Sequence, residues 1–169
     1  YNKLSEEEEP TDGDNFFSLT MSEEITSIRA TLTDAVNQQN LPKMLEMMDA
    51  AKYIYITGGR ASGMMAELFA NELRYLGLKV FTVPVASDYL DRLSAIGPED
   101  LVIALSFPRY TAQVVDGLRD LHEARIPVAL ITDAGLSPCH PYADIAFHCN
   151  VNSGYYFPCF SGCLSLINT

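Results

Sequence analysis

The spacing of hydrophobic and polar positions changes near residue 53. Before that point, apolar residues recur every three or four positions, which is typical of amphipathic helices. After it, short continuous apolar runs alternate with longer amphipathic stretches. Short apolar runs rich in β-branched residues predict buried strands, and the stretches between them predict helices. The chain therefore divides into a helical lead-in and a region of alternating strands and helices.

Two helices are predicted in the lead-in. The sequence TMSE at 20–23 has the form of a capping box, so the first helix is predicted to begin there. The second helix is predicted to begin at 40–42, because Pro42 suits the first turn of a helix. Residues 1–19 are polar and acidic and show no periodicity, so we interpret them as a flexible linker.

The alternating region predicts a parallel sheet. The predicted strands are 53–57, 79–84, 101–105, 127–132 and 144–149. The predicted helices are 61–76, 87–96, 112–124 and a final one that begins near 160. Apolar strands separated by helices are typical of a doubly wound α/β fold with both faces of the sheet covered. Right-handed crossovers leave few topologies, and a five-stranded order 2-1-3-4-5 (flavodoxin-like) is our first choice.

Two polar loops directly follow the first and third strands, GGRASG at 58–63 and SFPRYT at 106–111. In the order 2-1-3-4-5, the strand order reverses between strands one and three. Ligands of such sheets bind beyond the carboxyl ends of the strands at this reversal. The pattern therefore predicts that both loops face one crevice.

The first loop has groups that can receive an anion. Gly59 allows close approach of backbone, Ser62 brings a hydroxyl, and Arg60 brings a positive charge, all beside free amides at a helix N-terminus. The loop has neither the GxGxxG spacing nor the GK[ST] ending of nucleotide-binding loops. The alternative interpretation is a tight turn into a helix without any ligand.

The second loop brings two hydroxyls, a guanidinium and an aromatic ring, from Ser106, Thr111, Arg109 and Tyr110. Arginine suits bidentate contact with phosphate. The alternative is that a hydroxyl only caps the helix and Arg109 is solvated. The loop at 133–143 adds Ser137 and His140, and His140 is more typical of a surface loop than of a catalyst.

Composition and charge exclude some classes of function. The chain has 169 residues, 48% of them hydrophobic, which suits one compact domain with a real core. The net charge is -11, and residues 1–24 hold eight acids and one base. This charge argues against direct binding of DNA or RNA and against docking on an anionic membrane. Outside residues 1–24 the chain is only mildly acidic.

The sequence has no clear motif for a membrane span, for secretion or for a metal site. There is no run of 18 apolar residues and no leader, so the sequence predicts a cytoplasmic protein. The four cysteines lack paired CxxC spacing, so we interpret them as reduced thiols and expect neither a metal site nor a cofactor. Both ends look like cuts, so we expect a fragment of a longer protein.

Three segments together resemble the SIS (sugar isomerase) domain, and in particular the effector domain of RpiR-type bacterial transcriptional regulators. They are IYITGGRASG at 54–63, DLVIALSFPRYT at 100–111 and ITDAGLSPCHPYAD at 131–144. The resemblance covers roughly residues 20–169. It implies a phosphosugar ligand held by the loops after strands one and three, with contacts from Ser62, Ser106, Thr111 and Ser137.

The sequence departs from the usual SIS motifs at three positions. The first loop of the family usually reads G-x-G-x-S, and its second glycine is Arg60 here. The other loop usually reads S-x-S-G-x-T, and its second serine and its glycine are Pro108 and Arg109 here. A hydroxyl and a flexible amide are lost, and one or two arginines are gained. Two interpretations follow: arginine compensates electrostatically for the lost groups, or the ligand differs in its anionic group.

The resemblance also implies partners. In the regulators an N-terminal helix-turn-helix domain binds DNA and the chains form homodimers or homotetramers. No such domain is visible in this sequence, so DNA would be bound only through a domain outside it. The alternative is an aldose–ketose phosphosugar isomerase, which needs a positioned base. The candidates are Glu67, Glu72, His140 and His148, and no acid follows Asp144.

We therefore expect a sensor domain and not an enzyme. Another doubly wound fold, such as a flavodoxin-like or nucleotide-binding domain, is the third possibility.

Overall fold

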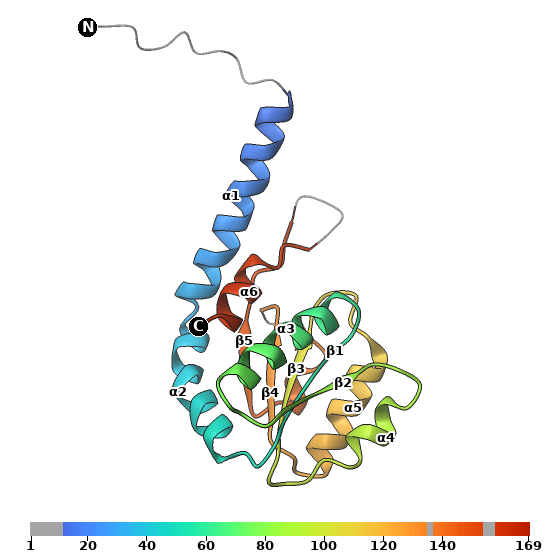
Figure 1. Ribbon diagram of the computed structural model, residues 1–169. Helices are drawn as coiled ribbons and strands as arrows, with labels where there is room; N and C mark the ends of the chain where they lie inside the picture. Colours follow the sequence, from blue (N-terminus) through green and yellow to red (C-terminus); the bar gives the residue numbers. More distant parts are fainter. Residues whose placement is uncertain (1–11, 135–136, 154–157) are drawn as a thin grey trace, which may run out of the picture.

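A five-stranded parallel sheet forms the centre of the protein, as the computed structural model shows for residues 12–134, 137–153 and 158–169 (Figure 1). The strands are β1 (Ile54–Gly58), β2 (Val80–Pro84), β3 (Leu101–Ser106), β4 (Val128–Thr132) and β5 (Ile145–His148). Every neighbouring pair is parallel, and the order is β2-β1-β3-β4-β5. The predicted fold class and strand order are confirmed.

Helices cover both faces of this sheet. The helices are α1 (Asp12–Thr33), α2 (Ala35–Ala50), α3 (Ala61–Tyr75), α4 (Tyr89–Leu93), α5 (Ala112–Glu123) and α6 (Ser161–Ile167), with a 3₁₀ turn η1 (His140–Tyr142). Side chains alternate between the faces along each strand. Ile103 packs on the side of α2, α3 and α6, and its neighbour Val102 packs on the side of α4 and α5. All six residues of β3 are buried, which explains its continuous apolar run.

The first helix begins earlier than predicted. Residues 12–19, expected to be part of a flexible linker, are the first turns of α1. Thr20 is not a cap, because its hydroxyl donates to the carbonyl of Phe16 at 2.9 Å within the helix. From Asp14 to Thr33 neither proline nor glycine interrupts the chain, so a helix can extend once formed. The rest of the predicted linker, residues 1–11, lies outside the described residues.

The second helix also begins earlier than predicted. Asp34 caps it, accepting hydrogen bonds from the amides of Val36 at 2.8 Å and Asn37 at 3.1 Å. Pro42 consequently lies inside α2 and not in its first turn. The cap separates α1 from α2, because Asp34 has an extended backbone with ψ of 120°. Figure 1 shows the result, with α2 against the sheet and α1 projecting away from it.

Helix α4 is shorter at both ends than the predicted range 87–96. Beyond Leu93 the amides of Ala95 and Ile96 donate to carbonyls three residues earlier, so the α-helical ladder stops. The carboxylate of Asp100 then accepts from the amide of Gly97 at 2.9 Å and closes the turn.

The cysteines, the possible metal ligands and the helices bear on the predictions made from composition. All four cysteines are buried free thiols, as predicted. Among residues 12–134, 137–153 and 158–169, no group of three or more His, Cys, Asp or Glu side chains could hold a metal ion. No helix in this described part is long and apolar enough to cross a membrane.

Candidate functional site

A cavity of about 300 Å³ lies beyond the carboxyl ends of β1 and β3. Its walls come from the loop before α3, the loop before α5 and the segment before α6. The residues that line it are Gly59, Arg60, Ala61, Ser62, Leu105, Ser106, Phe107, Pro108, Arg109, Thr111, Val114, Pro158 and Phe160. Six of the eight residues proposed from the sequence as ligand contacts are among them. The two loops therefore meet at the point where the strand order reverses.

Close approach of the two loops depends on Gly59. A Cβ atom added to Gly59 would collide with the hydroxyl oxygen of Thr111 and lie 3.0 Å from its Cβ. No side chain fits there unless Thr111 moves. Glycine is thus required for contact between the loops, and this contact closes one side of the cavity.

Two helix N-termini point their backbone amides toward this region. Helix α3 begins at Ala61 after Arg60, and α5 begins at Ala112 after Thr111. No described side chain caps either helix through a hydrogen bond. The amides of Ser62, Gly63 and Val114 donate to carbonyls of the preceding loops. The N-terminal ends of helices still carry a partial positive charge, so the cavity is suited to an anion.

Both loop arginines add positive charge and adopt unusual backbone angles. Arg60 has φ of 57° and ψ of -126°, and Arg109 has φ of 67°. Their side chains are exposed and line the cavity. Positive φ is typical of glycine, which is the residue that the SIS resemblance implies at both positions. The loops therefore keep the backbone of a glycine while carrying guanidinium groups.

The two serines of the cavity lie deeper in it. Ser62 in the first turn of α3 is 6% exposed, and Ser106 at the end of β3 is 4% exposed. The hydroxyl of Ser106 accepts a hydrogen bond from the thiol of Cys139 at 3.5 Å. Burial raises the pKa of that thiol, which therefore stays protonated and can donate.

Tyr110 and Ser137, also proposed from the sequence, do not line the cavity. The Tyr110 hydroxyl donates to the Asp133 carboxylate at 2.8 Å, tying the second loop to the end of β4. Burial and then this carboxylate raise the pKa of Tyr110. Ser137 is buried, and its hydroxyl accepts from the amide of Cys139 at 3.3 Å. Both residues support loops, and residues 135–136 next to Ser137 lie outside the described residues.

The third wall of the cavity could not be found from the sequence. Pro158 and Phe160 precede α6 and are about fifty residues away in the chain from the second loop. Phe160 packs edge-on against Phe107 with 5.4 Å between the ring centroids. No local motif marks these residues, because only the packing of α6 on the sheet brings them to the cavity.

The candidate bases lie elsewhere. None of the described residues that line the cavity has a carboxylate or an imidazole. Glu67 is exposed on α3 and lines a neighbouring hollow beside β2. His140 and His148 are half-buried and pack against each other with ring centroids 5.3 Å apart. His148 also lies 3.4 Å from the carboxylate of Asp34.

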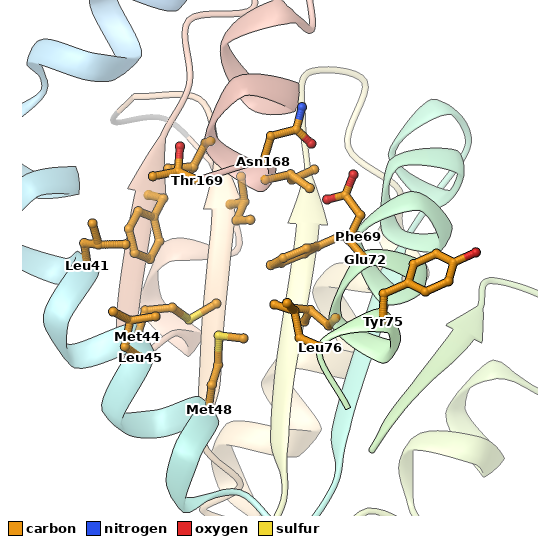
Figure 2. Close-up of a pocket in the computed structure, with 15 residues that line it drawn as sticks. Leu41, Met44, Leu45, Met48, Phe69, Glu72, Tyr75, Leu76, Asn168 and Thr169 are labelled. Carbon is orange, nitrogen blue, oxygen red and sulfur yellow. The ribbon is translucent and has the colours of Figure 1, made fainter. Parts of the chain in front are cut away.

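A second, larger cavity lies on one face of the sheet. It has a volume of about 540 Å³ and an almost wholly apolar lining. Figure 2 shows Leu41, Met44, Leu45 and Met48 of α2 on one side of it, and Phe69, Glu72 and Tyr75 of α3 with Leu76 on the other. We call it the apolar groove. Since Glu72 is the one charged residue among its described lining, the groove has no positive charge for an anion.

Comparisons with known proteins agree with this geometry. The profile of the SIS domain matches residues 47–168. The comparison with curated protein sequences gave no match. The sugar isomerase domain of an RpiR transcription factor from Sphaerobacter thermophilus superimposes with a TM-score of 0.85 at 21% identity, covering 91% of this chain and 86% of that one.

Two further solved structures show the range of proteins with this fold. The NanR protein of Vibrio vulnificus, complexed with ManNAc-6P, has a TM-score of 0.78 at 19% identity, covering 90% of this chain and 59% of that one. The phosphoheptose isomerase GmhA of Neisseria gonorrhoeae has a TM-score of 0.71 at 15% identity, covering 91% and 94%. At these identities the likeness is one of fold, and it includes both regulators and isomerases.

Proposed function

The chain belongs to the SIS domain family, and on that premise we propose that it is the ligand-sensing and oligomerisation domain of a bacterial, cytoplasmic RpiR-type transcriptional regulator. The ligand is a sugar phosphate or a related anionic sugar derivative. It binds in the cavity between the loops that follow β1 and β3. DNA is bound by a helix-turn-helix domain that is not in this chain.

The single observation that carries the proposal is the composition of that cavity. Two helix N-termini, two buried serine hydroxyls and two arginines converge there, and the described lining holds no acid. Backbone amides, hydroxyls and guanidinium groups are the partners that phosphate oxygens prefer. The resemblance in fold to NanR, whose structure contains ManNAc-6P, supports the same ligand class.

The absence of a base from the described lining supports a sensor over an enzyme. Aldose–ketose isomerisation moves a proton between neighbouring carbons and needs a base within about 3 Å of that proton. Thr111, Ser106 and Ser62 are not bases at neutral pH. We propose that they hold the ligand and do not transform it.

Contacts between the cavity wall and α1 support a role in signalling. The hydroxyl of Ser27 in α1 hydrogen-bonds to the carbonyl of Asn150 and accepts from the amide of Gly162 at 3.2 Å. The carboxylate of Glu24 accepts from Ser161 and from the thiol of Cys159 at 3.1 Å. These contacts flank Phe160, so a ligand that moves Phe160 would also move α1. A difference in affinity between two dimer arrangements would then change the spacing of the DNA-binding domains.

An apolar stripe on α1 supports an oligomer. Phe17, Met21, Ile25 and Leu32 recur at helical spacing, and Phe17 and Leu32 are each 69% exposed. Helices of single domains usually bury such a stripe, because exposed apolar patches favour association. We propose that α1 packs against another copy of the chain in a homodimer or homotetramer.

A thermal-shift screen against sugar phosphates and sugar acids tests ligand binding. A ligand at 100 times its dissociation constant should stabilise the fold by about 2.7 kcal/mol. Ser62→Ala should reduce the shift, because it removes a hydroxyl from the cavity. Ser94→Ala is the matched control, since Ser94 lies at the end of α4, away from the cavity, and its hydroxyl donates to the nearby carbonyl of Asp91 at 2.7 Å. No shift with any compound would contradict the proposal.

An assay of isomerase activity tests the alternative function, because the phosphoheptose isomerase GmhA has a similar fold. Purified chain incubated with aldose and ketose phosphates should give no interconversion by NMR. Interconversion of the two sugar phosphates would show that the protein is an enzyme and would contradict the proposed sensor function. A helix-turn-helix in the reading frame upstream of Tyr1 would favour the regulator.

A further inference from the structure

Three arginines are the non-glycine residues with positive φ among the described residues. They are Arg60 at 57°, Arg109 at 67° and Arg125 at 59°. Arg125 lies in the exposed turn that ends α5, where one residue with positive φ is common. Arg60 and Arg109 instead lie on the two loops of one cavity.

The backbone of these two arginines is costly. A side chain at positive φ clashes with its own backbone, and the combination at Arg60 of φ 57° and ψ -126° is one that glycine adopts far more readily. Such residues concentrate at functional sites, where the surrounding structure holds them in place. Two strained arginines on facing loops therefore point to a specific role in binding.

The cavity has two guanidinium groups in addition to groups that can hold one phosphate. The hydroxyls of Ser62 and Thr111 and the partial positive charge at the N-terminal ends of α3 and α5 can together hold a phosphate group. Arg60 and Arg109 each bring a guanidinium group to this lining, which has no carboxylate among its described residues, and Arg60 also borders the hollow that Glu67 lines. Both side chains are exposed at the cavity, where they can reach the part of a ligand that extends beyond its phosphate.

We propose that the ligand carries a second anionic group besides its phosphate, and that Arg60 and Arg109 bind that group. A phosphorylated sugar acid and a sugar bisphosphate both have this chemistry, because a carboxylate and a phosphate each match the fork of a guanidinium. This inference rests on the proposed function and specifies its ligand. Arg60 and Arg109 determine specificity, while the helix N-termini and hydroxyls bind the phosphate common to all sugar phosphates.

Calorimetric titration with matched compounds tests the inference. Gluconate 6-phosphate and glucitol 6-phosphate are both linear and differ in the carboxylate, and fructose 1,6-bisphosphate and fructose 6-phosphate differ in the second phosphate. At least one doubly anionic compound should bind ten or more times as tightly as the matched compound that has the phosphate alone. The compound that gains most identifies the second group as carboxylate or phosphate.

Three substitutions of arginine by glycine test which residues bind the second anionic group. Arg60→Gly and Arg109→Gly should each weaken binding of the doubly anionic compound at least tenfold. Binding of the matched compound with a single phosphate should weaken less than threefold. Both should also raise the Tm, because glycine relieves the backbone strain. Arg125→Gly is the matched control, which should raise the Tm and leave both affinities unchanged.

The outcomes separate the two proposals. If single phosphates bind as tightly as doubly anionic compounds, or if the glycine variants weaken both classes equally, this inference is wrong and the proposed function stands. If no compound of either class binds, the proposed function fails as well. A Tm that falls in Arg60→Gly and Arg109→Gly would show that the arginines stabilise the fold and are not retained for binding.

Discussion

Two of the cavities in the described part of the protein differ in both size and chemistry. The apolar groove holds about 540 Å³ and is walled by leucine, methionine and aromatic side chains of α2 and α3. The cavity beyond β1 and β3 holds about 300 Å³ and is walled by two loops with hydroxyls, amides and guanidinium groups. Volume alone would select the groove, whereas the chemistry selects the smaller cavity.

The difference follows from where each cavity lies on the sheet. The groove lies on one face of the sheet beside β4 and β5, where alternate side chains are apolar and form the core. The smaller cavity lies beyond the strand ends, where the chain turns and backbone N–H groups are not used by the ladder. At the strand ends, helix N-termini meet loops whose side chains are not needed for the core, so polar and charged residues can be placed there. Three substitutions can break or sharpen this distinction, and a fourth, at Tyr89, tests burial in the core on the other face of the sheet.

The largest effect is expected from Phe69→Ala. Phe69 lies in the wall of the groove, is 8% exposed and packs in the core. Loss of its ring should lower the free energy of unfolding by about 3–5 kcal/mol, measured by urea denaturation. The affinity of the folded fraction for a sugar phosphate should remain. Leu68→Ala, at the exposed neighbour, is the control and should cost much less. Loss of binding in folded Phe69→Ala would contradict the separation of the two cavities.

The next effect concerns Tyr89, a buried phenol of α4 that packs in the core on the other face of the sheet. Its hydroxyl is 3.2 Å from that of Thr57 in β1, and burial raises its pKa to about 12. Because the folded pKa lies above the unfolded value of 10, this group contributes full stability below pH 10. The contribution of about 3 kcal/mol is lost as the pH rises from 10 to 12.

Unfolding measured between pH 9 and 12 checks this expectation. Tyr89→Phe should be less stable than the wild type at pH 9, because it loses the hydrogen bond, but should lose less stability as the pH rises. Tyr75→Phe, at an 84% exposed position beside the groove, is the control and should follow the wild type. Identical alkaline profiles for all three proteins would show that the phenol is not buried.

A smaller effect is expected from Gly59→Ala. The added methyl group meets the Thr111 side chain, so the two loops must separate. Overpacking of this kind costs about 1–3 kcal/mol, and binding of a sugar phosphate should weaken about tenfold. Gly97→Ala is the control, since its nearest atom would be Asp100 Oδ2 at 3.7 Å. Unchanged affinity in Gly59→Ala would mean that contact between the loops is not needed for binding.

The smallest effect is expected from Leu76→Ser at the edge of the groove. Leu76 is 77% exposed, so the substitution should change the free energy of unfolding by no more than about 0.5 kcal/mol. Thermal shifts with sugar phosphates should match those of the wild type. A weaker shift would assign part of the ligand to the groove and remove the contrast between the two cavities.

Much of the fold could be predicted because its signals are local. Apolar runs such as 101–105 and 127–132 mark buried strands directly, and the order 2-1-3-4-5 follows from their alternation with helices. The start of α1 could not be predicted in this way, because helix extension through 12–19 has no strong local signal. The Asp34 cap does have a local signal, an aspartate directly before the helix, whereas the proline eight residues later is typical of a helix that begins at 40–42.

The candidate site also has features that a local sequence pattern predicts and features that it does not. The sequence by itself determined that GGRASG and SFPRYT follow strands one and three, because each loop is adjacent in the chain to the strand that positions it. It also determined that arginines occupy two positions where glycine is usual in the SIS motifs. It could not determine their strain, since a backbone angle depends on the contacts of the whole loop.

Only the tertiary structure decided which side chains reach the cavity. It turned Tyr110 toward Asp133, and it brought Phe160 from the other end of the domain to form the third wall. Both results depend on side-chain contacts between segments that are distant in the sequence. Such contacts are selected by packing of the complete core, so no local pattern records them.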